Sequence, residues 1–283
     1  MNKISMTSGT TIADWLQKAT RQLKEADIDS ARLDAEIILA HTIKKPRTYL
    51  HAHGDEAIEL RDLEIANARL DLRLEFTPVA YIIGHKEFYG RRFRVTTATL
   101  IPRPETETMI DMVKESLGTN LSLLPQTTRL VDVGTGTGCV GITLKLEIPE
   151  LEVTLSDLSN HALTIAKFNA RALRADVAFH RGDLLRDYRL PVDIICANLP
   201  YVDRSWEVSR ETHAEPDMAL YASNDGLALI HTLILQGTQL LPSGGKLFLE
   251  ADPRQHADMA AFAKQNEYTH TETRGYIMAL TKN

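Results

Sequence analysis

The chain has 283 residues, enough for two domains, and its 43% hydrophobic and 25% charged residues are typical of a globular protein. The net charge of −6, with only short basic patches, argues against stable direct binding to nucleic acid. No apolar run is long enough to cross a membrane, and the first residues lack a secretory signal. The two cysteines cannot form a disulfide framework and the ten histidines lack metal-ligand spacing, so we expect a cytoplasmic protein without a metal site.

The first part of the chain has the periodicity of helices. Apolar residues three and four positions apart form three runs, which begin at Ile12, Leu33 and Leu60, and the last run ends at Thr77-Pro78 because a residue before proline avoids the helical region. We predict a small helical domain over residues 1–78, with a face for docking a substrate. Residues 81–95, rich in aromatic and β-branched side chains around Gly90, predict a β-hairpin within a linker over residues 79–98.

From residue 99 to residue 283 the pattern is that of an α/β domain. Short apolar segments alternate with helical ones, and the expected strands cover residues 129–133, 151–156, 177–180, 192–197, 246–250, 268–271 and 276–280. This alternation predicts a doubly wound, Rossmann-like seven-stranded sheet, parallel and with helices on both faces.

A glycine-rich loop follows the first strand of this domain, in Val131-Asp-Val-Gly-Thr-Gly-Thr-Gly138. Alternating glycines let the backbone pass close to a ligand because no Cβ is in the way. Asp157, about 20 residues further on at the end of the next strand, can accept hydrogen bonds from both hydroxyls of a ribose. The loop and the acid together predict a nucleotide-type cofactor; the alternative is a structural turn.

Two cofactors fit such a loop. The glycines also satisfy the dinucleotide fingerprint, but Asp132 would place a carboxylate near the phosphates of NAD and repel them. S-Adenosyl-L-methionine carries an ammonium and a sulfonium group, which a nearby carboxylate stabilises, so the charges favour it. Asp183 is placed to reach the adenine amino group and Leu184 to pack on the ring, unless Asp183 only caps a helix or turn.

The sequence Asn198-Leu-Pro-Tyr201 follows the fourth strand, at the same edge of the sheet. An amide or aromatic amine nitrogen is a poor nucleophile because its lone pair is delocalised. The Asn198 side-chain oxygen and the Leu199 backbone carbonyl can hold both N–H groups and turn the lone pair toward a methyl donor. Pro200 stiffens the turn and Tyr201 provides a wall for the planar group. The alternative is a turn that merely ends a strand.

Several motifs carry a resemblance over most of the chain: Thr77-Pro-Val-Ala-Tyr-Ile-Ile-Gly84, Glu87-Phe-Tyr-Gly90, Leu100-Ile-Pro-Arg-Pro-Glu-Thr-Glu107, residues 132–138, Asn198-Leu-Pro-Tyr201, Ala214-Glu-Pro-Asp-Met-Ala-Leu220 and Asp225-Gly-Leu227. In these the chain resembles the HemK/PrmC family of protein-glutamine N(5)-methyltransferases, which act on class-1 peptide chain release factors. At two positions the chain departs from the family. Leu199 stands where proline is usual, which keeps the backbone acceptor but loosens the turn, and no glycine follows Glu250.

The resemblance implies a set of site residues. Those that would bind S-adenosyl-L-methionine are Gly134, Thr135, Gly136, Thr137, Gly138 and Asp157, with Asp183, Leu184 and Asn198 completing the cofactor site. Those that would hold the glutamine of a Gly-Gly-Gln motif during methylation are Asn198, Leu199, Pro200 and Tyr201. Arg103 and Glu105 would lie beside the pocket entrance; the alternative is an ion-paired linker.

Three other functions remain open from the sequence. A methyltransferase for a glutamine of ribosomal protein L3 would use the same chemistry, but Arg103-Pro-Glu-Thr-Glu107 favours the release-factor branch. A nucleic-acid adenine N(6)-methyltransferase would use the same turn for an exocyclic amine, and the acidic balance speaks against it. The third alternative is a binding module that has kept the fold without the activity.

Overall fold

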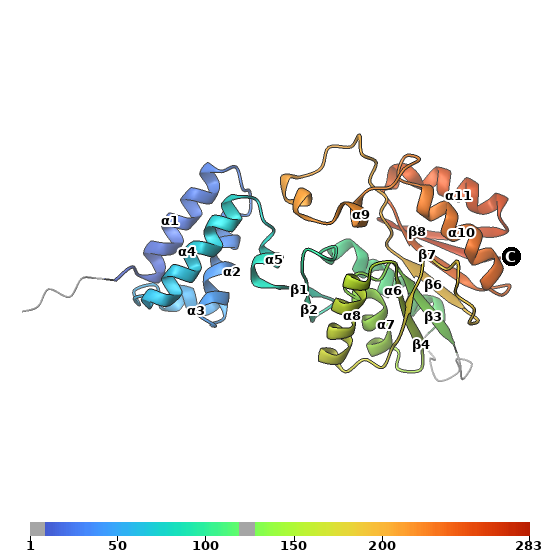
Figure 1. Cartoon of the computed structure of the whole chain (residues 1–283), viewed down its shortest axis with the longest axis horizontal. Helices are drawn as coiled ribbons and strands as arrows, with labels where there is room; N and C mark the ends of the chain where they lie inside the picture. The colour runs from blue at the N-terminus through green and yellow to red at the C-terminus, as the bar shows by residue number, and fades with distance from the viewer. Residues whose placement is uncertain (1–8, 119–127) are drawn as a thin grey trace, which may run out of the picture. The chain divides into compact units, whose positions relative to one another are not determined.

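A computed structural model describes residues 9–118 and 128–283. The chain forms two compact units. The first contains the residues up to Gly84 together with Ser209–Ala214, and the second contains His85–Val208 and Glu215–Asn283 (Figure 1). The first eight residues, where the absence of a secretory signal was predicted, lie outside the described part.

The first unit is helical, as its periodicity predicts. Its helices are α1 (Ile12–Glu25), α2 (Ala31–Thr42), α3 (Arg47–Ala52), α4 (Leu60–Leu74) and α5 (Val79–Ile83), with the 3₁₀ helix η3 (Arg210–Ala214). Trp15, Leu16 and Leu39 lie in its buried core, because the apolar stripes of α1 and α2 pack together. A capping box formed by Thr11 and Asp14 begins α1.

A buried ion pair lies inside this helical unit. The Arg73 side chain is 1% exposed and donates to Asp34 Oδ2 at 2.7 Å and to Glu211. A buried guanidinium needs such acceptors because an unpaired charge away from water is costly. Through Glu211, a segment far along the chain becomes part of the first unit.

The second unit begins with a β-hairpin of β1 (His85–Phe88) and β2 (Arg91–Arg94). The predicted hairpin was longer, over residues 81–95. It is shorter in the structure because Val79–Ile83 forms α5, which ends at Gly84 with a positive φ of 77°. Phe88 and Phe93 of the hairpin are buried in the core of the second unit.

A seven-stranded sheet forms the centre of the second unit, in the order β5-β4-β3-β6-β7-β9-β8. Its strands are β3 (Arg129–Val133), β4 (Glu152–Asp157), β5 (Ala178–Arg181), β6 (Ile194–Ala197), β7 (Lys246–Glu250), β8 (Tyr268–Arg274) and β9 (Ile277–Lys282). The predicted doubly wound α/β fold is confirmed. The sheet is not wholly parallel: β9 runs antiparallel to β7 and β8, because the two-residue connection at Gly275 and Tyr276 allows only an antiparallel pair.

Helices cover both faces of this sheet (Figure 1). One face packs on α6 (Glu107–Leu117), α7 (Cys139–Glu147) and α8 (Asn160–Leu173), and the other on α10 (Ala228–Leu240) and α11 (His256–Gln265). Shorter elements are η1 (Pro104–Thr106), α9 (Asp217–Leu220) and η4 (Pro253–Gln255). Because side chains alternate across a sheet, adjacent residues of one strand pack into different hydrophobic cores. On β3, Leu130 packs with α6, α7 and α8, and Val131 packs with α10 and α11.

The strand order reverses between β3 and β6. Chain segments that leave these two strands in opposite directions open a crevice at the carboxyl edge of a parallel sheet, where such folds bind ligands. The glycine loop follows β3 and the Asn198 turn follows β6, so the topology brings both motifs to this edge.

Candidate active site

A pocket at the carboxyl edge of the sheet gathers most of the predicted site residues. Its walls come from residues 98–103, 132–137, 156–159, 182–184, 198–200, 216, 218 and 219, all within the second unit. The glycine loop as far as Thr137, Asp157, Asp183, Leu184 and Asn198 therefore surround one cavity. Gly138 does not line it and instead lies against Ile142, where a Cβ would come within 2.7 Å of Ile142 Cδ1. Tyr201, which was expected to provide a wall for the substrate amide, is not among the lining residues, and it packs against the buried core of the second unit.

The glycine loop is shaped by backbone conformation and by Asp157. Gly134, Gly136 and Gly138 have positive φ values of 69°, 54° and 82°. The Gly136 N–H donates to Asp157 Oδ2 at 2.9 Å, and the Ser159 N–H donates to Asp157 Oδ1 at 2.8 Å. A Cβ on Gly136 would meet only the Gly134 carbonyl, at 4.0 Å, so the loop leaves open space where a ligand can pass.

Burial raises the pKa of Asp157, and hydrogen bonds from backbone N–H groups of Ser159, Gly136 and Leu158 oppose this rise. The N–H groups of Gly136 and Ser159 each use one lone pair, on different carboxylate oxygens, and the other two of the four lone pairs remain for the Leu158 N–H and a ligand. Asp157 can therefore organise the loop and still accept hydrogen bonds from a ligand.

Asp132 is buried at the base of the pocket. Its Oδ2 accepts from the Thr135 hydroxyl at 2.6 Å and from the Gly141 N–H at 3.0 Å. Burial raises the pKa of Asp132 to about 6, so its charge at neutral pH is held in a poorly solvated place. A positively charged ligand group nearby would stabilise this charge, whereas a phosphate would not.

The side chains of Asp183 and Leu184 differ in environment. Leu184 is buried, has a positive φ of 54° and lines the pocket. Asp183 is 45% exposed and pairs with Arg186 at 3.0 Å, a partner that the sequence did not suggest. The carboxylate that was expected to reach an adenine amino group is thus shared with a surface cation.

The Asn198 turn is held by contacts of its first two residues with Thr106 and with the glycine loop. Asn198 Nδ2 donates to the Thr106 hydroxyl at 3.1 Å, and the Leu199 side chain is buried against the glycine loop. A Cβ on Gly134 would lie 2.8 Å from Leu199 Cδ2, so the glycine makes room for this leucine. The residue that departs from the family pattern thus packs directly on the glycine loop.

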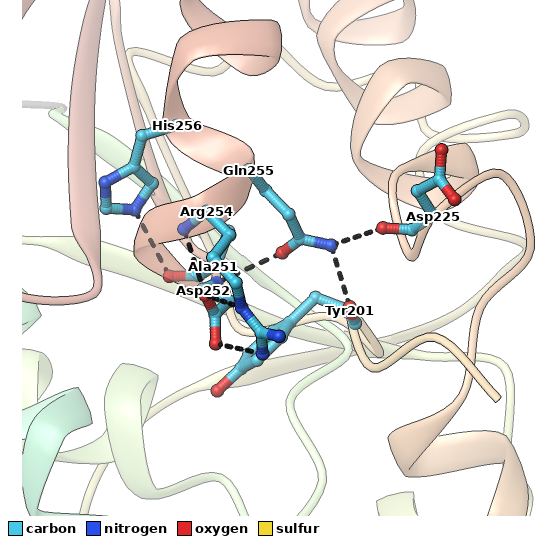
Figure 2. A network of polar contacts seen from close by, with 7 residues as sticks. All are labelled: Tyr201, Asp225, Ala251, Asp252, Arg254, Gln255 and His256. Atoms are coloured by element: carbon cyan, nitrogen blue, oxygen red, sulfur yellow. Dashed lines mark hydrogen bonds and ion pairs between the residues drawn. The ribbon is translucent and has the colours of Figure 1, made fainter. Parts of the chain in front are cut away.

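The end of the turn is held by Gln255, which reasoning from the sequence missed (Figure 2). Its Nε2 donates to the Tyr201 carbonyl at 2.9 Å and to the Asp225 carbonyl at 2.6 Å, and its Oε1 accepts from the Asp252 N–H at 3.1 Å. Next to it, a Cβ on Gly226 would lie 1.9 Å from the Tyr201 oxygen. The capping box in Asp252-Pro-Arg-Gln255 was the available signal.

Replacing Gln255 by leucine is expected to lower the free energy of unfolding by about 1–3 kcal/mol, because two backbone carbonyls lose the donor that the buried Gln255 side chain supplies. The turn should shift and turnover should fall. Denaturant unfolding and activity measured together check this. The matched control is Gln265→Leu, an exposed glutamine at the end of α11. Equal stability and turnover of the two variants would show that Gln255 does not hold the turn.

Arg103 lines the pocket, and its guanidinium group is ion-paired with Glu215. Glu215 is buried, accepts from the Arg103 guanidinium, and accepts from the Ile101 N–H at 3.0 Å. Arg103 is therefore both a pocket residue and an ion-paired residue, and the two interpretations of the sequence do not exclude each other. Glu105 lies on η1, where its charge acts on Glu250 at the end of β7.

The two parts of the chain match two protein families. Residues 14–84 match the family described as "PrmC N-terminal domain", and residues 106–215 match "Methyltransferase small domain". No helix in the described ranges 9–118 and 128–283 has the length and apolar character that a membrane span requires.

Similar proteins match over nearly the whole chain. A "Release factor glutamine methyltransferase" of Nitratidesulfovibrio vulgaris is 38% identical over 92% of this chain and 88% of its own length. One of Deinococcus radiodurans is 36% identical over 88% of this chain and 89% of its own length. Among solved structures, the hMettl16 catalytic domain in complex with an RNA hairpin has a TM-score of 0.52 at 15% identity, covering 80% of this chain and 82% of that one. This last similarity concerns the fold alone.

Proposed function

The chain belongs to the family of release factor glutamine methyltransferases, and on this basis we propose that it methylates the N(5) amide of the glutamine in the Gly-Gly-Gln motif of class-1 peptide chain release factors. The observation that carries the proposal is one pocket lined both by the glycine loop with Asp157 and by Asn198. A cofactor loop and an amide acceptor in a single cavity are what methyl transfer to an amide nitrogen needs.

The methyl donor in this proposal is S-adenosylmethionine. When bound, it supplies a methyl group on a positively charged sulfur. The glycine loop leaves open space for it, Asp157 would accept from the ribose hydroxyls, and the buried charge of Asp132 suits its ammonium group. Leu184 and Asp183 would border the adenine.

The turn would orient the glutamine amide. The Asn198 side-chain oxygen and the Leu199 carbonyl would accept one amide N–H each, so that the nitrogen lone pair faces the methyl donor and charge that develops on nitrogen is stabilised. Pro200 lines the pocket and limits the movement of the turn. No strong base is needed, because the amide proton becomes acidic as the nitrogen is methylated.

The helical unit would dock the release factor, and the reaction would take place in the cytoplasm, where translation terminates. The match of residues 14–84 to the "PrmC N-terminal domain" family supports this docking role, since methyl transfer itself does not need an additional helical domain. Stable direct binding to nucleic acid is not part of the proposal.

Methyl transfer to purified release factor, ribosomal protein L3 and DNA, measured in parallel with the same cofactor, tests the proposal. We expect methylation of the release factor only. Faster methylation of L3 or of adenine in DNA would assign the same site to another substrate and would overturn the proposal.

A further inference from the structure

A carboxyl group with no assigned role lies under the Asn198 turn. Glu250 ends β7, and its side chain is 1% exposed. Its Oε1 accepts a long hydrogen bond from the Tyr201 hydroxyl, at 3.5 Å. Its Oε2 is buried and has no hydrogen-bond partner among the described residues. A buried carboxyl so poorly satisfied is costly for stability, which suggests that it serves the site.

A short chain of side chains connects Glu250 with Asn198. Asn198 Nδ2 donates to the Thr106 hydroxyl at 3.1 Å, and the side chains of Thr106, Tyr201 and Asn198 lie close enough to Glu250 to lower its pKa as polar neighbours. Thr106 is 2% exposed, so water does not compete for its hydroxyl. Because this hydroxyl accepts from Asn198, its single hydrogen is left to be donated to the carboxyl group.

The direction of this chain decides which way the Asn198 amide faces. An asparagine side chain can turn either its oxygen or its NH₂ toward the pocket. The Thr106 hydroxyl alone does not decide between them, because it can accept from the NH₂ or donate to the oxygen. An ionised carboxylate can only accept. It therefore fixes the hydrogen of Thr106 toward Glu250 and the NH₂ of Asn198 toward Thr106, which leaves the Asn198 oxygen for the pocket.

We propose that Glu250 is a positioning residue which, through Thr106, holds the Asn198 side chain with its oxygen turned toward the substrate amide. The inference rests on the proposed function for its consequence in catalysis, since only an N–H donor in the substrate needs that oxygen. Glu250 itself does not touch the substrate in this scheme.

The charges around Glu250 make the arrangement sensitive to pH. Burial and the Glu105 charge raise the pKa of Glu250, the polar groups of Thr106, Tyr201 and Asn198 lower it, and the net pKa is about 7. Other titratable or charged groups close to Glu250 or to Tyr201 are Cys139, Arg103, Asp252 and Tyr276. Protonated Glu250 can donate to Thr106 and release the amide orientation. The ordered state is therefore present above the pKa and is lost as the pH falls through it.

The orientation can be tested without a substrate. In protein labelled with ¹⁵N at asparagine, the side-chain NH₂ signals of Asn198, identified by their loss in Asn198→Ala, should shift with a midpoint near the Glu250 pKa of about 7. Glu250→Gln should abolish this shift. Glu150→Gln, which removes an exposed carboxylate, should retain it. A signal that does not titrate, or that titrates equally in Glu250→Gln, would overturn the inference whether or not release factor is methylated.

The consequence for catalysis is tested by single-turnover methyl transfer to release factor at saturating cofactor. The wild-type rate should rise as the pH increases through neutrality. Glu250→Gln should lack this rise and be roughly tenfold slower, the effect of one lost hydrogen bond. Thr106→Val should be equally slow, and Thr106→Ser should keep most of the rate. The double variant that combines Glu250→Gln with Thr106→Val should be no slower than either of these single variants.

Additive losses in the double variant would show that Glu250 and Thr106 do not act in one chain. Cofactor affinity should be unchanged in all variants, which checks that they are folded. If the wild type methylates no release factor while the Asn198 signals titrate as expected, the proposed function fails and the orientation chain stands.

Discussion

Replacing Asn198 by alanine is expected to slow methyl transfer by roughly 100- to 1,000-fold, the typical loss for one hydrogen-bonding group that stabilises a transition state. The side chain lines the pocket, and Thr106 holds its NH₂ group, so its oxygen is available to the substrate amide. Single-turnover kinetics at saturating cofactor separate this chemical effect from binding.

Cofactor affinity provides the internal control for Asn198→Ala. It should change far less than the rate, because the cofactor site is built mainly from the glycine loop and Asp157. Wild-type turnover by this variant would refute the acceptor role of Asn198. An equal loss of cofactor binding would place Asn198 in the cofactor site instead.

Replacing Asp157 by alanine is expected to weaken S-adenosylmethionine binding by about 2–3 kcal/mol, roughly 30- to 150-fold in Kd. The ligand loses two charge-assisted hydrogen bonds, and the loop loses the acceptor of the Gly136 N–H at 2.9 Å. Calorimetric titration measures this change.

Asp176→Ala is the matched control, since Asp176 is exposed and lies outside the cofactor pocket. Its affinity should equal that of the wild type. Unchanged affinity in Asp157→Ala, or tight NAD binding by the wild-type protein, would contradict the cofactor assignment.

The fold and the main motifs could be predicted from the sequence because their signals are local. The apolar period changes from helical to strand-like, and each motif lies directly after a strand, so the rule for the carboxyl edge of a parallel sheet brings them together. The glycine loop, Asp157 and Asn198 were expected at one edge and line one pocket. The antiparallel last strand was missed because periodicity does not reveal strand direction.

The supports of the site could not be predicted, because they join residues that are distant in sequence. Gln255 holds the carbonyl of Tyr201, which is 54 residues away, and Asn198 bonds to Thr106 across 92 residues. Glu211 joins the helical unit through Arg73, which no periodic pattern indicates. In the sequence Glu250 is simply the polar end of an apolar strand, and only its burial beside the turn points to a role in the site.

The most direct test of the proposed reaction is transfer of a radiolabelled methyl group from S-adenosylmethionine to two forms of one release factor. One form keeps the glutamine of the Gly-Gly-Gln motif, and the other has alanine in its place. We expect label in the first form and none in the second. Equal labelling of both forms, or labelling of neither, would contradict methylation of this glutamine by the chain.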